Sequence, residues 1–184
     1  MIDFDSLDKN KTYIGLQYGE GFISKKIRKY SKRYAKNSER IPTHVLAFVY
    51  ENDGWKIYES HARGFKNLEI AAGVRRMTLE QWQKAESETL DQFVAVEMPL
   101  NLDVMKQHLG ESYSLGDIRS LFLAAIFHRN GKQKDRDGLI CSEYMALCYP
   151  PICEKYNLPP WCITPAHFQD YIDCSKGALN VRNS

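Results

Sequence analysis

A strongly apolar segment followed by a turn signal constrains the fold of this chain more than any other feature. Residues 43–50 are rich in Val, Leu, Phe and Tyr and are apolar on both faces, as expected of a buried central strand. The turn signal Glu51-Asn52-Asp53-Gly54 follows, and residues 55–60 form the predicted return strand. The sequence therefore predicts a β-hairpin whose first strand lies in the core.

The other predicted elements are short strands and helices on either side of this hairpin. Further strands are expected at 13–17, 73–77 and 92–98, and helices at 22–36, 78–88, 101–110, 115–128, 139–149 and 164–174. Strands in the middle of the chain with helices flanking them favour an α+β fold over alternating βαβ units. The chain has 184 residues, 43% of them hydrophobic. We therefore expect one domain over residues 1–184.

Several classes of protein are disfavoured by composition. No apolar run approaches the roughly 20 residues that cross a membrane, so we expect no transmembrane segment. Residues 1–11 are polar and acidic and do not resemble a secretory signal, so we expect a cytoplasmic protein. No motif for a cofactor is found, and we expect none.

All five cysteines lie in the last 44 residues of the chain. An odd number without a signal peptide predicts free thiols. Their clustering also suggests a structural zinc site or a redox protein, but the spacings are 7, 5, 9 and 12 residues and no Cys-x-x-Cys pair occurs. Such sites usually contain close ligand pairs, so we expect no metal. The five are Cys141, Cys148, Cys153, Cys162 and Cys174.

The net charge is only +2, but the charge is unevenly distributed. Residues 25–40 contain eight Lys or Arg and one Glu. Such a stretch is either an ordinary solvated helix face or a surface that attracts an anionic partner, such as a lipid surface or an acidic cell-wall polymer. No nucleic-acid-binding motif surrounds it, so we expect no specific nucleic acid.

Cys141 is the cysteine best placed to act as a nucleophile. It begins the predicted helix Cys141-Ser142-Glu143-Tyr144, directly after Gly138-Leu139-Ile140. A helix N-terminus places free N–H groups and a partial positive charge beside the sulfur, which favours a thiolate. The same N–H groups suit a developing oxyanion. A buried cysteine is nevertheless more often an ordinary core residue.

His44 is the candidate base, and the hairpin supplies its partner. If Asn52 and Asp53 form the tip, His44 lies opposite His61, and Glu59 lies diagonally from His44 on the same face. A carboxylate there would orient the imidazole and stabilise its protonated form. The face alone does not separate Glu59 from His61 as the partner, but the carboxylate is the better orienter. His61 is either a neighbour or a substrate contact.

Three segments resemble the permuted papain-like enzymes of the NlpC/P60 superfamily, specifically the YiiX/YaeF-like amidase group. They are Thr43-His44-Val45, Ile57-Tyr58-Glu59-Ser60 and Leu139-Ile140-Cys141-Ser142-Glu143-Tyr144. The order His, Glu, Cys is the mark of the circular permutation, since unpermuted relatives place the cysteine first. The segments Gly19–Ser24 and Thr164–Phe168 also resemble this group. The likeness covers most of the chain, but each motif is short.

The resemblance implies a papain-like α+β fold with a central antiparallel sheet. It implies a Cys141–His44–Glu59 triad that hydrolyses an amide through a thioester. Two features depart from the family. Its first strand usually opens with Gly-Asp, where this chain reads Tyr13-Ile14-Gly15-Leu16-Gln17. The family also tends to carry a tyrosine shortly before the cysteine near the site. Here Tyr113 is a candidate, but it stands 28 residues before Cys141 with a predicted helix between them. The side chain that would complete the oxyanion site is not identified.

The leading hypothesis is therefore a cysteine amidase or peptidase, with cell-wall peptide as one candidate substrate. A lipid-directed acyl hydrolase or acyltransferase of the same fold is an alternative, because related permuted enzymes act on lipids. An inactive binding module that keeps the fold is a further alternative.

Overall fold

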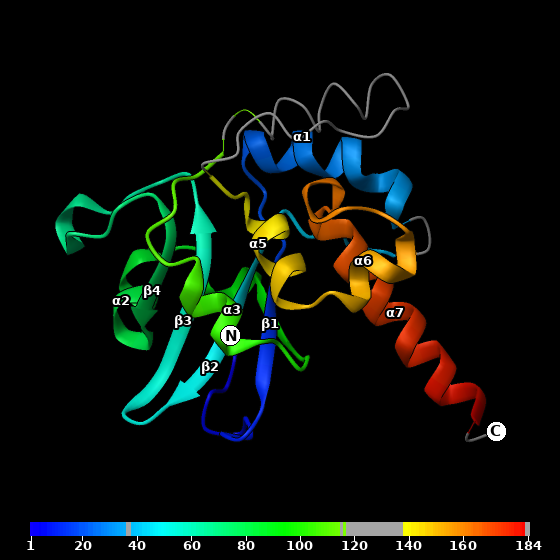
Figure 1. Ribbon diagram of the computed structural model, residues 1–184, viewed down its shortest axis with the longest axis horizontal. Coiled ribbons are helices and arrows are strands. Elements are labelled where there is room, and N and C mark those ends of the chain that lie inside the picture. Colours follow the sequence, from blue (N-terminus) through cyan, green and yellow to red (C-terminus); the bar gives the residue numbers. More distant parts are fainter. Residues whose placement is uncertain (36–37, 115, 117–137, 183–184) are drawn as a thin grey trace.

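The core of the protein is a single five-stranded antiparallel sheet in the order β4-β3-β2-β1-β5 (Figure 1). The computed structural model describes residues 1–35, 38–114, 116 and 138–182. The strands are β1 (Thr12–Gln17), β2 (His44–Glu51), β3 (Gly54–His61), β4 (Gly73–Thr78) and β5 (Phe93–Glu97). Each predicted strand is confirmed to within one residue at either end. The buried strand β2 lies at the centre of the sheet.

Helices interrupt and follow the strands. They are α1 (Phe22–Ser31), α2 (Leu79–Ala85), α3 (Leu102–Gln107), α5 (Cys141–Cys148), α6 (Pro151–Tyr156) and α7 (Pro165–Arg182). Short 3-10 turns are η1 (Lys32–Tyr34), η2 (Lys66–Leu68), η3 (Leu90–Gln92) and η4 (Pro160–Cys162). The α+β class is confirmed. No helix in the described part of the chain is long and apolar enough to span a membrane.

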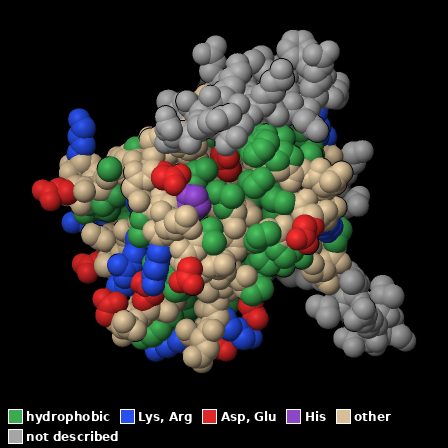
Figure 2. Space-filling model, in the orientation of Figure 1, with side chains coloured by type: hydrophobic (Ala, Val, Ile, Leu, Met, Phe, Trp, Pro, Cys, Tyr) green, Lys and Arg blue, Asp and Glu red, His purple; other side chains and the backbone are tan. Residues whose placement is uncertain are grey.

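The sheet is buried on both faces, which explains why β2 is apolar throughout. Val45, Ala47 and Val49 belong to a cluster with α5, α6 and α7. Leu46 and Phe48 belong to a second cluster that includes Trp82 of α2, Phe4 and Phe93. Successive side chains of a strand point to opposite faces, so one apolar strand serves two cores. On the face shown in Figure 2, hydrophobic side chains gather toward the C-terminal helices.

The hairpin register agrees with the prediction. Ala47 pairs with Tyr58 and Glu51 pairs with Gly54, so Asn52 and Asp53 form the tip. The start of β2, the end of β3 and the end of β1 therefore meet at one end of the sheet. His44 and His61 lie at this end, and Gln17 of β1 pairs with His44.

The helix boundaries differ more from the predictions than the strand boundaries do. The first helix was expected over 22–36 but ends at Ser31, where η1 follows and Ala35 leaves the helical region. The last helix was expected to end near Cys174 but continues to Arg182, because Gly177 weakens a helix without terminating it. The helix expected at 115–128 lies outside the described residues, apart from Gly116.

Candidate active site

His44 and Glu59 form a buried pair at the end of the sheet. The Nε2 atom of His44 lies 2.8 Å from Oε2 of Glu59. The two residues are 8% and 1% exposed, so water screens this interaction little. The bond occupies Nε2 and leaves Nδ1 as the ring nitrogen available to another group. The expected contact between His44 and Glu59 is present.

Arg75 binds the other oxygen of the Glu59 carboxylate. β3 pairs with β4 so that Glu59 lies directly opposite Arg75. The Nε and Nη2 atoms of Arg75 donate to Oε1 of Glu59 at 2.9 and 2.6 Å. Nη1 of Arg75 donates to the carbonyl oxygens of Arg63 and Ala71 at 2.6 and 3.0 Å. The Arg75 side chain is therefore fixed by two backbone carbonyls as well as by Glu59, and it fixes the Glu59 carboxylate in turn.

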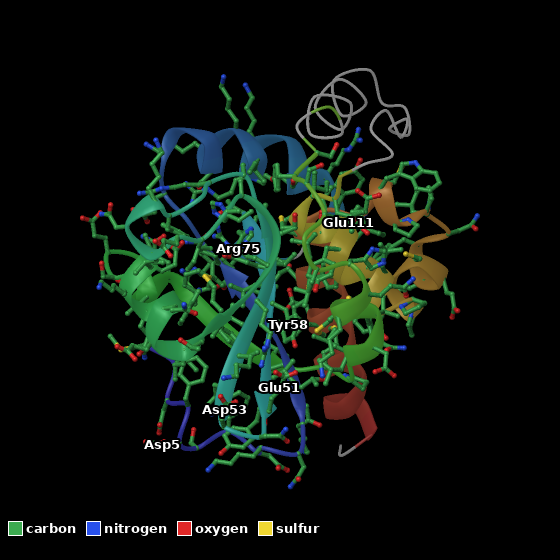
Figure 3. All side chains as sticks on the ribbon, turned by 60° about the vertical axis from the view of Figure 1, so that its left-hand side comes forward. Asp5, Glu51, Asp53, Tyr58, Arg75 and Glu111 are labelled. Atoms are coloured by element: carbon green, nitrogen blue, oxygen red, sulfur yellow. The ribbon has the colours of Figure 1, made fainter. Side chains whose placement is uncertain are left out.

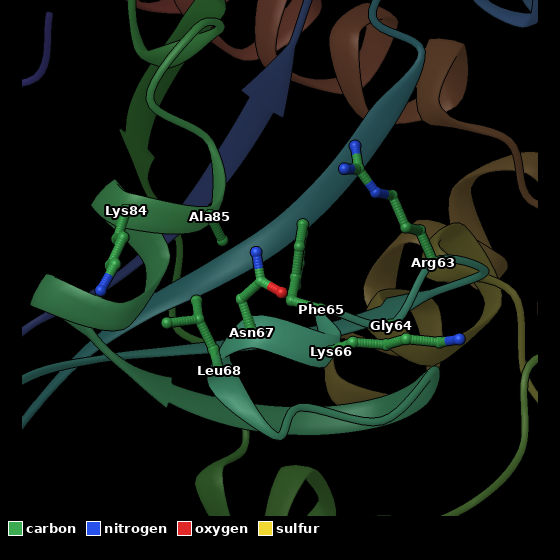
Figure 4. Close-up of a pocket in the computed structure, with 8 residues that line it drawn as sticks. All are labelled: Arg63, Gly64, Phe65, Lys66, Asn67, Leu68, Lys84 and Ala85. Carbon is green, nitrogen blue, oxygen red and sulfur yellow. The ribbon is translucent and has the colours of Figure 1, made fainter.

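The loop between β3 and β4 completes the support of Arg75. The Phe65 ring lies 4.7 Å from the Arg75 guanidinium carbon. This loop and α2 also line a surface pocket of about 470 Å³ that contains Lys66 and Lys84 (Figure 4). The lining contains none of the predicted catalytic residues. Figure 3 shows Arg75 toward the α1 end of the sheet, with Glu51 and Asp53 toward the hairpin turn.

Interactions among these buried groups shift the pKa values of Glu59 and His44. Burial alone would raise the pKa of Glu59, but the hydrogen bond from His44 and the charges of His44, His61 and Arg75 lower it to about 2. Burial alone would lower the pKa of His44, but Cys141 and Glu59 both stabilise the imidazolium and raise it to about 10. Cys141 is thus one of the groups that act on the charge of His44.

Cys141 is the first residue of α5, as predicted, and its neighbours fix that helix end. The Ser142 hydroxyl donates to the carbonyl of Ile163 at 2.7 Å. The Ser60 hydroxyl donates to the carbonyl of Leu139 at 2.5 Å. Cys141 itself is 8% exposed. β3, which carries Glu59, therefore also anchors the segment that leads into Cys141.

Gly138 allows a second segment to approach this helix start closely. The Leu139 N–H donates to the Ser112 carbonyl at 2.9 Å, and Ser112 forms a parallel bridge with Gly138. A Cβ atom at Gly138 would lie 2.8 Å from the Ser112 carbonyl oxygen and 3.0 Å from the Ser114 nitrogen. Only glycine fits this contact without movement of backbone.

Tyr113 is brought to the site by this contact, although 28 residues separate it from Cys141. Burial, followed by the nearby Cys141 and Glu59, raises the pKa of Tyr113 well above its usual value. The phenol therefore stays protonated at neutral pH and can donate a hydrogen bond.

His61 lies beside His44 but does not replace Glu59 as its partner. The two rings meet edge to face, with centroids 5.0 Å apart. The Arg63 N–H donates to Nδ1 of His61 at 2.9 Å, so Nε2 carries the proton of the neutral ring. Burial and the positive charge of His44 lower the pKa of His61 to about 4. His61 is therefore neutral at physiological pH.

The four other cysteines occupy different surroundings. All five thiols are free. Cys148 and Cys162 are buried, Cys153 is partly exposed and Cys174 is exposed. Burial raises the pKa of Cys148 to about 12. Among the described residues, no group of three or more His, Cys, Asp or Glu side chains is arranged to hold a metal ion.

The sequence matches no protein-family model, and it matches no curated protein. The chemistry of the site therefore rests on the geometry of its own residues.

Sequence reasoning missed Arg75 and the contact between Ser112 and Gly138. Arg75 lies in the predicted strand 73–77, and only the pairing of that strand with β3 places it opposite Glu59. The signal in the sequence was a charged residue, Arg75, next to the apolar Val74 within a predicted strand. The contact at Gly138 joins residues 26 positions apart, and no local pattern indicates it.

Proposed function

We propose that this protein is a cysteine hydrolase in which Cys141 is the nucleophile, His44 the base and Glu59 the residue that orients the base. The observation that carries the proposal is the buried contact between His44 and the Glu59 carboxylate, while Cys141 also raises the pKa of His44. A nucleophilic cysteine needs a base within reach and a third group that orients the base. We include the circularly permuted papain-like fold in this proposal.

The reaction follows from the roles of these groups. His44 takes the thiol proton, and the Cys141 sulfur attacks the substrate carbonyl carbon to form a tetrahedral oxyanion. The free N–H groups at the start of α5 and the Tyr113 hydroxyl stabilise the oxyanion. The imidazolium then protonates the leaving amine, and the C–N bond breaks to leave a thioester. His44 next activates a water molecule, which hydrolyses the thioester and regenerates the thiol.

Arg75 supports this chemistry without touching the substrate. A carboxylate that interacts with two cationic groups remains ionised and fixed, so it stabilises the imidazolium throughout the cycle. The substrate proposed is an amide, either a peptide or a cell-wall fragment. An activated ester would be cleaved by the same steps.

Selective alkylation tests the nucleophile. A limiting dose of iodoacetamide at neutral pH should label Cys141 faster than Cys174, although Cys174 is exposed and Cys141 is 8% exposed. The preference should disappear in His44→Ala and persist in His108→Ala, a histidine whose partner is Glu111. If the five thiols label in order of exposure, the proposal is wrong.

Turnover requires a second measurement. Incubation with p-nitrophenyl acetate should release a burst of nitrophenolate and leave an acetyl group on Cys141, detected by peptide mass spectrometry. Cys141→Ala should abolish the burst, while Cys174→Ala should retain it. A selectively labelled Cys141 without acetylation would instead support an inactive binding module.

A further inference from the structure

Helix α1 and the first residue of η1 carry four cationic side chains on one face. Lys25, Arg28, Lys29 and Lys32 follow the spacing i, i+3, i+4 and i+7, which places them in neighbouring turns on the same side. Together with Arg40 and Tyr18, they line a hollow of about 680 Å³, which we call the basic groove. This volume lies within the range of small-molecule binding sites.

The charges of the basic groove are not neutralised within the described chain. None of its five cations forms an ion pair in the residues that the structure describes. Two carboxylates, Glu20 and Glu39, also line the hollow, so a positive excess remains. Like charges four residues apart destabilise a helix, and Lys25 and Lys29 form such a pair within α1. An anion from outside the described chain would offset this cost.

Arg40 is held in a position that suits an anionic ligand. Its guanidinium carbon lies 4.2 Å from the centre of the Tyr18 ring. The Tyr18 hydroxyl donates to Oε1 of Gln169 at 2.5 Å, which fixes the ring. A guanidinium stacked on a fixed ring keeps its N–H donors in a planar array that matches the oxygens of a phosphate.

The basic groove adjoins the proposed catalytic site. Tyr18 directly follows Gln17, which pairs with His44. Ile41, which also lines the groove, is three residues before His44. The Thr43 N–H donates to the Gln17 carbonyl at 2.7 Å, and the Gly19 N–H donates to Thr43 Oγ1 at 3.1 Å. The groove and the triad therefore share the end of the sheet over which α1 lies (Figures 1 and 3).

We infer that the basic groove binds a phosphate group of the substrate, so that the amide or ester cleaved at Cys141 belongs to a phosphate-bearing molecule. The statement that the phosphate belongs to a substrate rests on the proposed hydrolase function. Phosphate binding by the groove can be tested without it. The phosphate could belong to a soluble molecule or to a lipid headgroup, and the two sources share the same chemistry.

Direct binding tests the phosphate site. Calorimetry with pyrophosphate reports a soluble source, and flotation with phosphatidylcholine vesicles, with and without phosphatidylglycerol, reports a headgroup. The variant Lys25→Glu/Lys29→Glu reverses two exposed charges and should weaken binding by roughly tenfold or more. Lys66→Glu/Lys84→Glu changes the net charge equally at the other pocket and should retain the affinity (Figure 4).

The outcomes separate the sources and the alternatives. Binding of pyrophosphate identifies a soluble phosphate, and binding only of phosphatidylglycerol vesicles identifies a headgroup; either supports the phosphate site. Equal losses in the two double variants, no binding by either probe, or equal affinity for polyglutamate would overturn it. Cys141→Ala should bind pyrophosphate or the vesicles as the unmodified protein does. Failure of the groove proposal can therefore be distinguished from failure of the hydrolase proposal.

Two alkylating reagents test whether the groove acts on the catalytic site. Iodoacetate and iodoacetamide differ in charge and little in shape, so the ratio of their rates at Cys141 reports the local potential. Lys25→Glu/Lys29→Glu should lower the iodoacetate-to-iodoacetamide ratio by roughly threefold at low salt. Lys66→Glu/Lys84→Glu should leave it unchanged. A ratio that falls equally in both variants would overturn the assignment of the groove to the substrate.

Discussion

Arg75 and Glu59 face each other across β3 and β4, and two guanidinium nitrogens of Arg75 bind one oxygen of the Glu59 carboxylate. His44 binds the other oxygen. The carboxylate is thus shared between the proposed base and a fixed cation. Arg75, Glu59, His44 and Cys141 come from four elements, the consecutive strands β4, β3 and β2 and the helix α5, which lies far from them in sequence.

Replacement of Arg75 should impair the base without touching the thiol. Arg75→Met leaves Glu59 buried with one cationic partner fewer, so the pKa of Glu59 should rise from about 2 and its hold on His44 should weaken. We expect acetylation of Cys141 to slow by about tenfold or more and the acid limb of its pH profile to move to higher pH. Stability should fall by about 3 kcal/mol.

Arg76→Met is the matched control for this prediction. Arg76 is adjacent in the same strand, but its side chain is 42% exposed and pairs with Glu51. Its loss should leave the pH profile of Cys141 unchanged. A profile that moves equally in both variants would mean that Arg75 acts only through general stability. Arg75→Lys should restore part of the effect, because one bond to Glu59 can be kept.

Tyr113 should affect hydrolysis but not alkylation. Acetylation by an ester develops an oxyanion, whereas alkylation by iodoacetamide does not. If the Tyr113 hydroxyl donates to the oxyanion, Tyr113→Phe should slow the nitrophenolate burst by about 10- to 100-fold and leave the rate of iodoacetamide labelling within about twofold. Parallel losses in both reactions would assign Tyr113 to the activation of the thiol instead.

The hairpin and its charged pair were predictable because the rules involved are local. The apolar run at 43–50, the turn at 51–54 and the alternation of side chains together place His44, Glu59 and His61 at one end of the hairpin. The start of the helix at Cys141 is equally local. These four positions were found from sequence. The structure brings His44 into contact with Glu59, and Cys141 raises the pKa of His44.

The rest of the site depends on contacts between distant segments. Arg75 becomes relevant only when β4 pairs with β3, and Tyr113 only when Ser112 meets Gly138. Helix ends were also harder to predict. Helix α1 continues directly into the 3-10 turn η1, and no Pro or Gly in the sequence marks its end.

Gly138→Ala should disturb Cys141 through the backbone. The added Cβ would meet the Ser112 carbonyl oxygen at 2.8 Å, and neither backbone segment can move away as a flexible side chain would. We expect a loss of stability of about 1–3 kcal/mol and slower acetylation of Cys141. Gly21→Ala is the control, because a Cβ there meets nothing within 4 Å. Thermal unfolding and the burst rate provide the measurements; similar effects at both glycines would contradict the proposed contact.

His167 should make the protein less stable in mild acid. It is 1% exposed, and its Nδ1 accepts a hydrogen bond from the Thr164 N–H at 3.0 Å. Burial lowers its pKa from 6.5 to about 4. The unfolded chain therefore binds a proton between pH 6.5 and 4 that the folded protein does not bind. Stability from this group is full above pH 6.5 and is lost as pH falls toward 4, by at most about 3 kcal/mol.

Urea unfolding between pH 4 and 7 measures this loss, and His167→Gln tests its origin. Gln can accept the Thr164 bond but cannot titrate, so the slope of unfolding free energy against pH should decrease over this range. His61, whose pKa is also lowered to about 4, contributes a second slope of the same sign. His61→Gln should therefore remove a further part, and the double variant should be the flattest of the three. A slope unchanged in His167→Gln would place the acid sensitivity elsewhere in the protein.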